Sequence, residues 1–200
     1  MSTGQIGTFH TLADRLIPGE IARPETLKRV QDWTQCSLHM RTGTAGTDLE
    51  PDAILASIRL TGAGRKAVLD RSFGFDDAAQ SWICRPGQDC AALLSWGMAG
   101  ASRRAQTATL RALMASWRQF YAATPVLARG RSVSGQKLLI RLGFRRLDTQ
   151  GSRSSENYTG FDQEAPSSSQ DQTYICDHYP RRFDADLVRS PRLCGTRKAA

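Results

Sequence analysis

The sequence predicts a mixed α/β (α+β) fold in which helices flank a central sheet. Three observations predict it. Apolar and polar residues alternate over 54–60, which is typical of a strand. An apolar run of strand length, 89–100, leads into a long amphipathic helix, and a shorter strand and helix follow. The 40% hydrophobic and 23% charged residues are enough for an ordinary core and argue against wholesale disorder.

The N-terminal segment predicts two helices. Thr11-x-x-Asp14 resembles a capping box, so we expect a short helix over 11–17. Pro24 predicts the first turn of a second helix, over 24–36, because proline is favoured at that position. The Gly- and Thr-rich segment after it predicts a loop.

Residues 53–75 predict a β-hairpin. The period of two from Ile54 to Leu60 indicates its first strand. The Gly-Ala-Gly sequence at 62–64 predicts a flexible turn, and apolar residues continue on the return strand. A helix over 52–60 is the competing interpretation, since its alanines and leucines fit either state.

Residues 89–100 predict a strand, and 103–121 predict the clearest helix in the chain. The apolar residues of this helix are spaced i, i+3, i+4, i+7 and i+11, so they form one stripe that we expect to be buried. The stripe consists of Leu110, Leu113, Met114, Trp117 and Tyr121.

A short strand, 124–130, and a second helix, 132–142, complete the pattern. A glycine inside a helix costs about 1 kcal/mol relative to alanine. We therefore expect Gly135 to allow close packing against another backbone or a ligand. Gly143 is placed to end the helix in a left-handed conformation.

The composition predicts three regions. Residues 1–50 form an N-terminal helical region, and 51–150 hold the strands and helices of the core. Residues 151–200 form a polar linker and tail rich in Ser, Gln and Asp, in which 173–183 could return as a terminal strand.

The net charge of +8 is concentrated in one quarter of the chain. Residues 101–150 hold ten basic groups and one acid, whereas the rest of the chain is close to balanced. Such a field attracts phosphate, either in a nucleic acid or in a cofactor such as coenzyme A. The alternative is that these basic groups form an ordinary solvated surface and bind no phosphate.

The five cysteines do not predict a disulfide framework, because their number is odd and no secretory signal precedes them. Neither Cys84 with Cys90 nor Cys176-x-His178 has the spacing of a compact zinc site, so no metal is expected. No apolar run is long enough to cross a bilayer. We expect a cytoplasmic protein, and its oligomeric state is not predicted.

The order of elements and the last helix resemble the Gcn5-related N-acetyltransferase superfamily. In that family the last helix commonly carries Asn-x-x-Ala-x-x-Leu-Tyr-x-x-x-Gly-Phe. Leu138, Gly143 and Phe144 match this motif in place, while Ser132 and Gly135 stand for Asn and Ala. The resemblance implies a central, mostly antiparallel sheet and an acyltransferase core. It also implies acetyl-CoA or another acyl-CoA as cofactor, with a small-molecule or protein amine as acceptor.

The resemblance also implies a phosphate site. In the family, the N-terminus of the long helix receives the CoA pyrophosphate through a loop similar to Gln/Arg-x-x-Gly-x-Gly/Ala, because helix N-termini bind anions. Here glutamine replaces the central glycine. The implied cofactor-binding residues are Arg103, Arg104, Gln106, Thr107, Ala108, Arg129, Arg131, Ser132 and Gly135.

The catalytic groups are less well defined. Leu139 stands where many family members have a tyrosine that protonates the CoA thiolate. Ser132 and Ser134 are the hydroxyls near that helix terminus, and Ser134 is the candidate acid, although both could instead cap the helix. Asp89, and less so Asp70, is the candidate general base for the amine.

Two other functions stay open. A basic nucleic-acid-binding protein could use the two helices as a helix-turn-helix-like unit, with Lys137, Arg141, Arg145 and Arg146 contacting phosphate. The connector, 122–131, is longer than the usual turn of three or four residues. A non-catalytic acyltransferase-like scaffold would account for the missing glycine and tyrosine.

Overall fold

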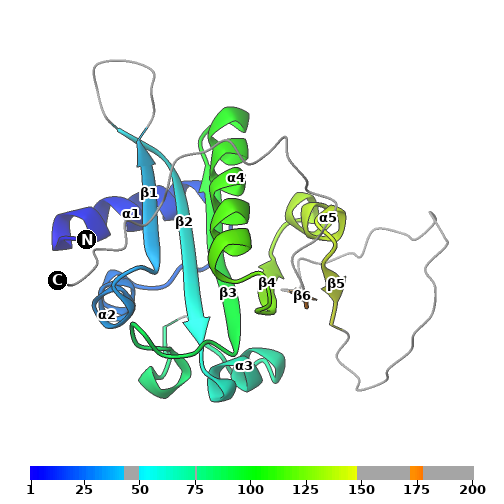
Figure 1. Ribbon diagram of the computed structural model, residues 1–200. Coiled ribbons are helices and arrows are strands. Elements are labelled where there is room, and N and C mark those ends of the chain that lie inside the picture. The colour runs from blue at the N-terminus through cyan, green and yellow to red at the C-terminus, as the bar shows by residue number, and fades with distance from the viewer. Residues whose placement is uncertain (43–49, 75, 148–171, 178–200) are drawn as a thin grey trace.

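The computed structural model describes residues 1–42, 50–74, 76–147 and 172–177. Within them, six strands form one sheet in the order β1-β2-β3-β4-β6-β5 (Figure 1). β3 and β4 are parallel, and every other neighbouring pair is antiparallel. The predicted mixed α/β class with a mostly antiparallel sheet is therefore confirmed. The strands are β1 (Leu38–Thr42), β2 (Pro51–Leu60), β3 (Ala92–Gly100), β4 (Val126–Gly130), β5 (Arg145–Arg146) and β6 (Gln172–Cys176).

Helices cover both faces of the sheet. Ile54 and Leu127 point to one face, where they pack in the cores under α1, α2 and α3. Val126 and Ala128 point to the other, under α4 and α5, because side chains alternate along a strand. The helices are α1 (Thr3–Leu16), α2 (Pro24–Thr34), α3 (Gly62–Leu69), α4 (Arg103–Phe120) and α5 (Val133–Arg141), with a 3-10 turn η1 (Gln80–Trp82) beside α3.

The second half of the predicted hairpin over 53–75 is wrong. β2 occupies the first half, but the return segment is α3, and β2 pairs with β1 and β3 instead. The Thr61 side chain starts α3 by accepting a hydrogen bond from the Gly64 N–H at 3.2 Å. A Cβ on Gly64 would lie only 2.1 Å from the Trp82 carbonyl oxygen. The glycine therefore serves close helix packing rather than a turn.

The N-terminal region also differs from the prediction. α1 begins at a capping box formed by Ser2 and Gln5, well before Thr11. The strand β1, at the edge of the sheet, was not predicted, and its last two residues fall in the predicted loop, 41–52. Within that loop, 43–49 lie outside the described residues and β2 begins at Pro51. The predicted second helix is confirmed as α2, with Pro24 in its first turn.

The C-terminal half follows the sequence pattern closely. Met114 and Trp117 of the predicted stripe are buried, and Gly143 ends α5 with a φ of +81°. β6 confirms the terminal strand and lies between β4 and β5, so it belongs to the central sheet. The predicted linker and tail, 151–171 and 178–200, lie outside the described residues. Among the helices that are described, none is both long and apolar enough to span a bilayer.

β3 carries one extra residue relative to β2. Ser95 and Gly97 pair with consecutive residues of β2, which leaves Trp96 as a β-bulge. Beyond the bulge the alternation of side chains is reversed. Gly97 therefore faces the α1–α2 layer, as Trp96 does, and a Cβ on it would lie 3.3 Å from Ile17 Cδ1.

A half-buried histidine on β1 predicts a pH-dependent stability. A ring nitrogen of His39 lies 2.9 Å from the Cys36 carbonyl oxygen, yet burial lowers the pKa of His39 below its ordinary value. The unfolded chain therefore binds more protons than the folded one as the pH falls below about 6.5, so folding becomes less stable. We expect the urea midpoint to drop between roughly pH 7.5 and 5.5, and His39→Gln to flatten that slope. Equal slopes in the two proteins would refute the assignment.

Candidate functional site

The parallel ladder between β3 and β4 is short. It joins Leu93–Ser95 to Val126–Ala128, although β3 continues to Gly100 and β4 to Gly130. Beyond Ser95, no described strand pairs with the β4 side of β3. The two parallel strands therefore part at Ser95, just before the bulge.

Both parallel strands end in the same strand-to-helix turn. The pattern Gly-x-Ser-x-x-x-Gln occurs at 100–106 after β3 and at 130–136 after β4. In each copy the glutamine side-chain amide donates to the carbonyl oxygen of the glycine, at 3.0 and 3.1 Å respectively. The matching turns bring the N-termini of α4 and α5 to the same edge of the sheet (Figure 1).

The serine of each turn is the N-cap of its helix. Ser102 Oγ accepts from the Ala105 N–H at 3.1 Å, and Ser132 Oγ makes the equivalent bond in α5 at 3.0 Å. The backbone amides of Arg103 and Arg104 come before the first residue that can bond within the helix. Such amides, together with the helix dipole, favour an anion at this position.

The glycines that end the two strands are required by close packing. A Cβ on Gly100 would lie 2.6 Å from the Gln106 nitrogen, and one on Gly130 would lie 3.0 Å from the Tyr174 ring. Gly135, in contrast, approaches only the hydroxyl of its own N-cap within 4 Å. The close packing predicted for Gly135 against another backbone is therefore not found among the described residues.

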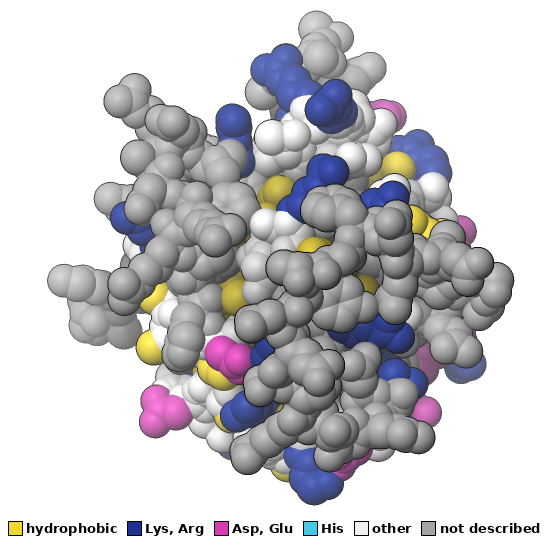
Figure 2. All heavy atoms as spheres, turned by 90° about the vertical axis from the view of Figure 1, so that its right-hand side faces the viewer, with side chains coloured by type: hydrophobic (Ala, Val, Ile, Leu, Met, Phe, Trp, Pro, Cys, Tyr) yellow, Lys and Arg dark blue, Asp and Glu magenta, His cyan; other side chains and the backbone are white. Residues whose placement is uncertain are grey.

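The start of α4 carries the positive charge. Three arginines line a shallow depression there, and none of the described residues in its lining is acidic. Figure 2 shows the face on the α5 side, where Lys and Arg side chains recur from top to bottom and acids are fewer. Gln106 turns away to the Gly100 carbonyl. The lining residues are Arg103, Arg104, Thr107, Ala108 and Arg111.

Arg129 and Arg131 lie elsewhere. Arg129 Nη2 donates to the Phe73 carbonyl oxygen at 3.0 Å, and Arg131 Nη1 donates to the carbonyl oxygen of Glu20. Phe73 belongs to the core on the α1–α3 face, and Glu20 to the connection between α1 and α2. The structure therefore does not bring these two arginines to the depression at the start of α4.

Both arginines line a cavity of about 60 Å³ between the sheet and α1. It lies where β3 and β4 part, because Trp96 and Gly97 of the bulge line it as well. Glu20, which is exposed, is the one acidic residue among the described residues that line it. The apolar lining residues are Phe9, Ala13, Ile17, Ile21, Ala22, Leu27, Ile54, Ala56 and Trp96.

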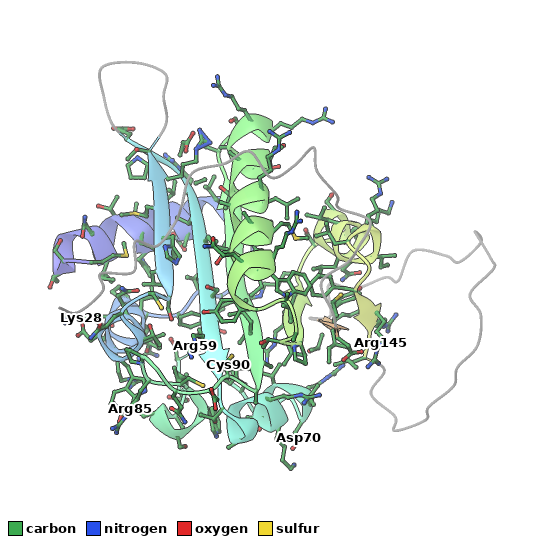
Figure 3. The ribbon with its side chains drawn as sticks, in the orientation of Figure 1. Lys28, Arg59, Asp70, Arg85, Cys90 and Arg145 are labelled. Carbon is green, nitrogen blue, oxygen red and sulfur yellow. The ribbon has the colours of Figure 1, made fainter. Side chains whose placement is uncertain are left out.

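The predicted general base lies at the wrong end of β3. Asp89 precedes the strand, and its carbonyl oxygen accepts from the Cys84 thiol at 3.3 Å. The strand carries the chain roughly 30 Å away from it before α4 begins. Figure 3 shows Asp70, directly after α3, and Cys90, next to Asp89, far from the start of α4. Glu20 was missed because only tertiary packing brings the α1–α2 connection to the cavity.

The hydroxyl groups near α5 differ in exposure. Ser134 is exposed on the first turn of the helix, while Leu139 packs against the core around Trp117. Tyr174 of β6 is buried, and its hydroxyl donates to Gln172 Oε1 at 3.1 Å. Burial raises the pKa of Tyr174, so its hydroxyl stays protonated at neutral pH.

No three His, Cys, Asp or Glu side chains come together as a metal site within the part of the chain that is described. Comparisons with protein-family models, curated proteins and solved structures found no match. The geometry of the site is therefore the basis for assigning a function.

Proposed function

We propose that the protein is an N-acyltransferase that moves an acetyl or other acyl group from acyl-CoA to an amine. The supporting observation is the pair of parallel strands that part at Ser95 and lead through matching turns into α4 and α5. In the N-acetyltransferase superfamily that the sequence resembles, the pantetheine arm of CoA enters between two such strands. Ligands bind at the carboxyl ends of parallel strands in open α/β sheets generally.

The start of α4 fits the diphosphate of the cofactor. Two backbone amides precede the first bonds within the helix, and the helix dipole favours negative charge there. Arg103, Arg104 and Arg111 add three positive charges at the same depression. From there the pantetheine arm would follow the edge of β3 toward Ser95, which places the thioester beside the cavity.

Glu20 is the candidate base in this arrangement, in place of Asp89. Its carboxylate takes a proton from the ammonium group of the acceptor, and the neutral amine then attacks the thioester carbonyl carbon. The nitrogen of the tetrahedral intermediate loses its second proton to solvent, and the intermediate collapses with formation of the amide and cleavage of the C–S bond. The CoA thiolate leaves and takes a proton from solvent, either directly or through a hydroxyl such as that of Ser134, which solvent reprotonates.

Nucleic-acid binding is the second candidate, because residues 101–147 hold ten basic groups and no acid. The helix-turn-helix form of that hypothesis is wrong. β4 occupies the connector between the two helices and pairs with β3 on one side and β6 on the other. Arg145, one of the expected phosphate contacts, pairs with Asp177 at 3.1 Å.

A charge-matched pair of variants tests the cofactor site. We expect the double variant Arg103→Gln, Arg104→Gln to weaken acetyl-CoA binding by about tenfold, as isothermal titration calorimetry would measure it. Arg118→Gln with Arg141→Gln removes the same charge from exposed sites in the last turns of α4 and α5. This control should bind acetyl-CoA as the wild type does. An equal loss in both double variants would mean that only overall charge matters and would count against the site.

A further inference from the structure

The cavity beside the bulge combines an apolar lining with charge of mixed sign. Most of its lining comes from α1, the α1–α2 connection and β2, and is aliphatic or aromatic. Arg129 and Arg131 line it with two basic side chains, and Glu20 is the acidic residue among the described residues of the lining. A ligand that fits must therefore have an apolar part and a charged part close together.

The volume limits the apolar part. An enclosed apolar cavity of about 150 Å³ binds benzene, whereas this one, which is partly open, has about 60 Å³. A short branched aliphatic group suits such a space better than an aromatic ring does. A Cβ added to Gly97 would lie 3.3 Å from Ile17 Cδ1, which leaves little room for a larger residue at that side.

The charged lining favours an anion at one end of the ligand. Arg129 and Arg131 are two residues apart at the end of β4, and each is held by a backbone carbonyl oxygen, of Phe73 and Glu20 respectively. An arginine carries five donors in a planar fork that matches a carboxylate, so a carboxylate can add to these contacts. Neither a polyamine nor an internal lysine side chain of a protein offers a carboxylate to these donors.

We propose that the cavity binds a small aliphatic amino acid, or a closely similar amino carboxylate, as the acyl acceptor. The carboxylate lies against Arg129 and Arg131, and the short side chain fills the apolar part. The amino group lies on the side of Glu20, toward the parting of β3 and β4. The role of the amino group rests on the proposed acyltransferase function, whereas the binding of the aliphatic carboxylate does not.

A binding experiment without acyl-CoA tests whether the cavity binds an aliphatic carboxylate. The probes are L-valine, L-valinamide, isovalerate, L-phenylalanine and inorganic phosphate, followed by ligand-detected NMR on the full chain. We expect valine and isovalerate to bind and to compete. Valinamide, which lacks the carboxylate, should bind at least tenfold more weakly than valine. Phenylalanine should also bind more weakly, because its side chain is larger than the apolar part of the cavity. Equal binding of valine and valinamide, or competition by phosphate as strong as that by isovalerate, would overturn the proposal.

A turnover experiment separates this inference from the proposed function. Release of CoA thiol from acetyl-CoA is followed with valine, valinamide and isobutylamine as acceptors. Turnover restricted to valine supports both the transferase function and the amino-acid acceptor. Turnover with the two amines that lack a carboxylate, but not with valine, would keep the transferase and overturn the acceptor class. Selective valine binding without acetyl-CoA binding or turnover would keep the amino-acid site and overturn the transferase.

Three single variants test which arginines bind the carboxylate of valine. We expect Arg131→Gln and Arg129→Gln each to raise the KM for valine about tenfold and to leave the KM for acetyl-CoA unchanged. Arg131 lies after β4, so its variant keeps the sheet even if loss of the Phe73 contact unfolds the Arg129 variant. Arg118→Gln, on the exposed last turn of α4, is the control and should change neither constant. An unchanged KM for valine in folded Arg131→Gln would overturn the placement.

Discussion

Replacing Glu20 with glutamine is expected to lower kcat for acyl transfer by about a hundredfold or more at neutral pH. A general base typically contributes a factor of about 10² to 10⁴, and Glu20 is the one acidic residue among the described residues that line the cavity. The glutamine keeps the backbone carbonyl that accepts from Arg131, so the α1–α2 connection should hold its position. The measurement is release of CoA thiol under saturating acetyl-CoA.

The control is Asp89→Asn, the same chemical change at the other end of β3. It should leave kcat unchanged because Asp89 lies in the loop before the strand. At a pH above the pKa of the acceptor amine no base is needed, so the deficit of the Glu20 variant should shrink there. A purely structural role would not give this recovery. Full activity in Glu20→Gln at neutral pH would contradict the assignment.

Replacing Trp117 with alanine is expected to lower the free energy of unfolding by about 3–5 kcal/mol, the usual cost of removing a large aromatic side chain from a core. Trp117 is 1% exposed, and its ring centroid lies 5.8 Å from that of Phe144. It fixes α4 on the sheet together with Met114 and Leu93. Urea denaturation measures the change.

Ile140→Ala on α5 is the comparison for that variant. Ile140 is 60% exposed, so its replacement should change the free energy of unfolding by no more than about 0.5 kcal/mol. A loss below about 1 kcal/mol in Trp117→Ala would mean that the packing around α4 is looser than the structure shows.

Local patterns predicted the half of the fold that follows β3. The spacing of Met114 and Trp117 specifies a buried helix face without reference to the rest of the chain, and Gly143 supplies the left-handed residue that ends α5. The prediction of a hairpin was wrong because Gly64 suits a turn as well as a helix. Its real constraint is the approach of the Trp82 carbonyl, which is a tertiary contact. β1 was missed because it has only five residues, so the alternation of Leu38 and Met40 with His39 and Arg41 repeats just twice.

The candidate site, like the fold, was predicted from the sequence only where local patterns determine it. Arg103 and Arg104 were found because they begin the strongest helix of the chain. Arg129 was placed at the phosphates because the sequence does not say on which face of the sheet α4 lies. Alternation along β4 turns Arg129 away from α4, to the α1–α3 face. Glu20 reaches the cavity only through the packing of α1 and α2 on the sheet, which no local pattern encodes.

Titration with acetyl-CoA, followed by tryptophan fluorescence, tests the proposed function most directly. Trp96 lies at the parting of β3 and β4, so a bound pantetheine arm should change its emission, and Trp96→Phe should remove that signal. We predict saturable binding to one site that persists at moderate salt, while binding of duplex DNA weakens steeply as salt rises. Tight DNA binding with no response to acetyl-CoA would contradict the proposed function.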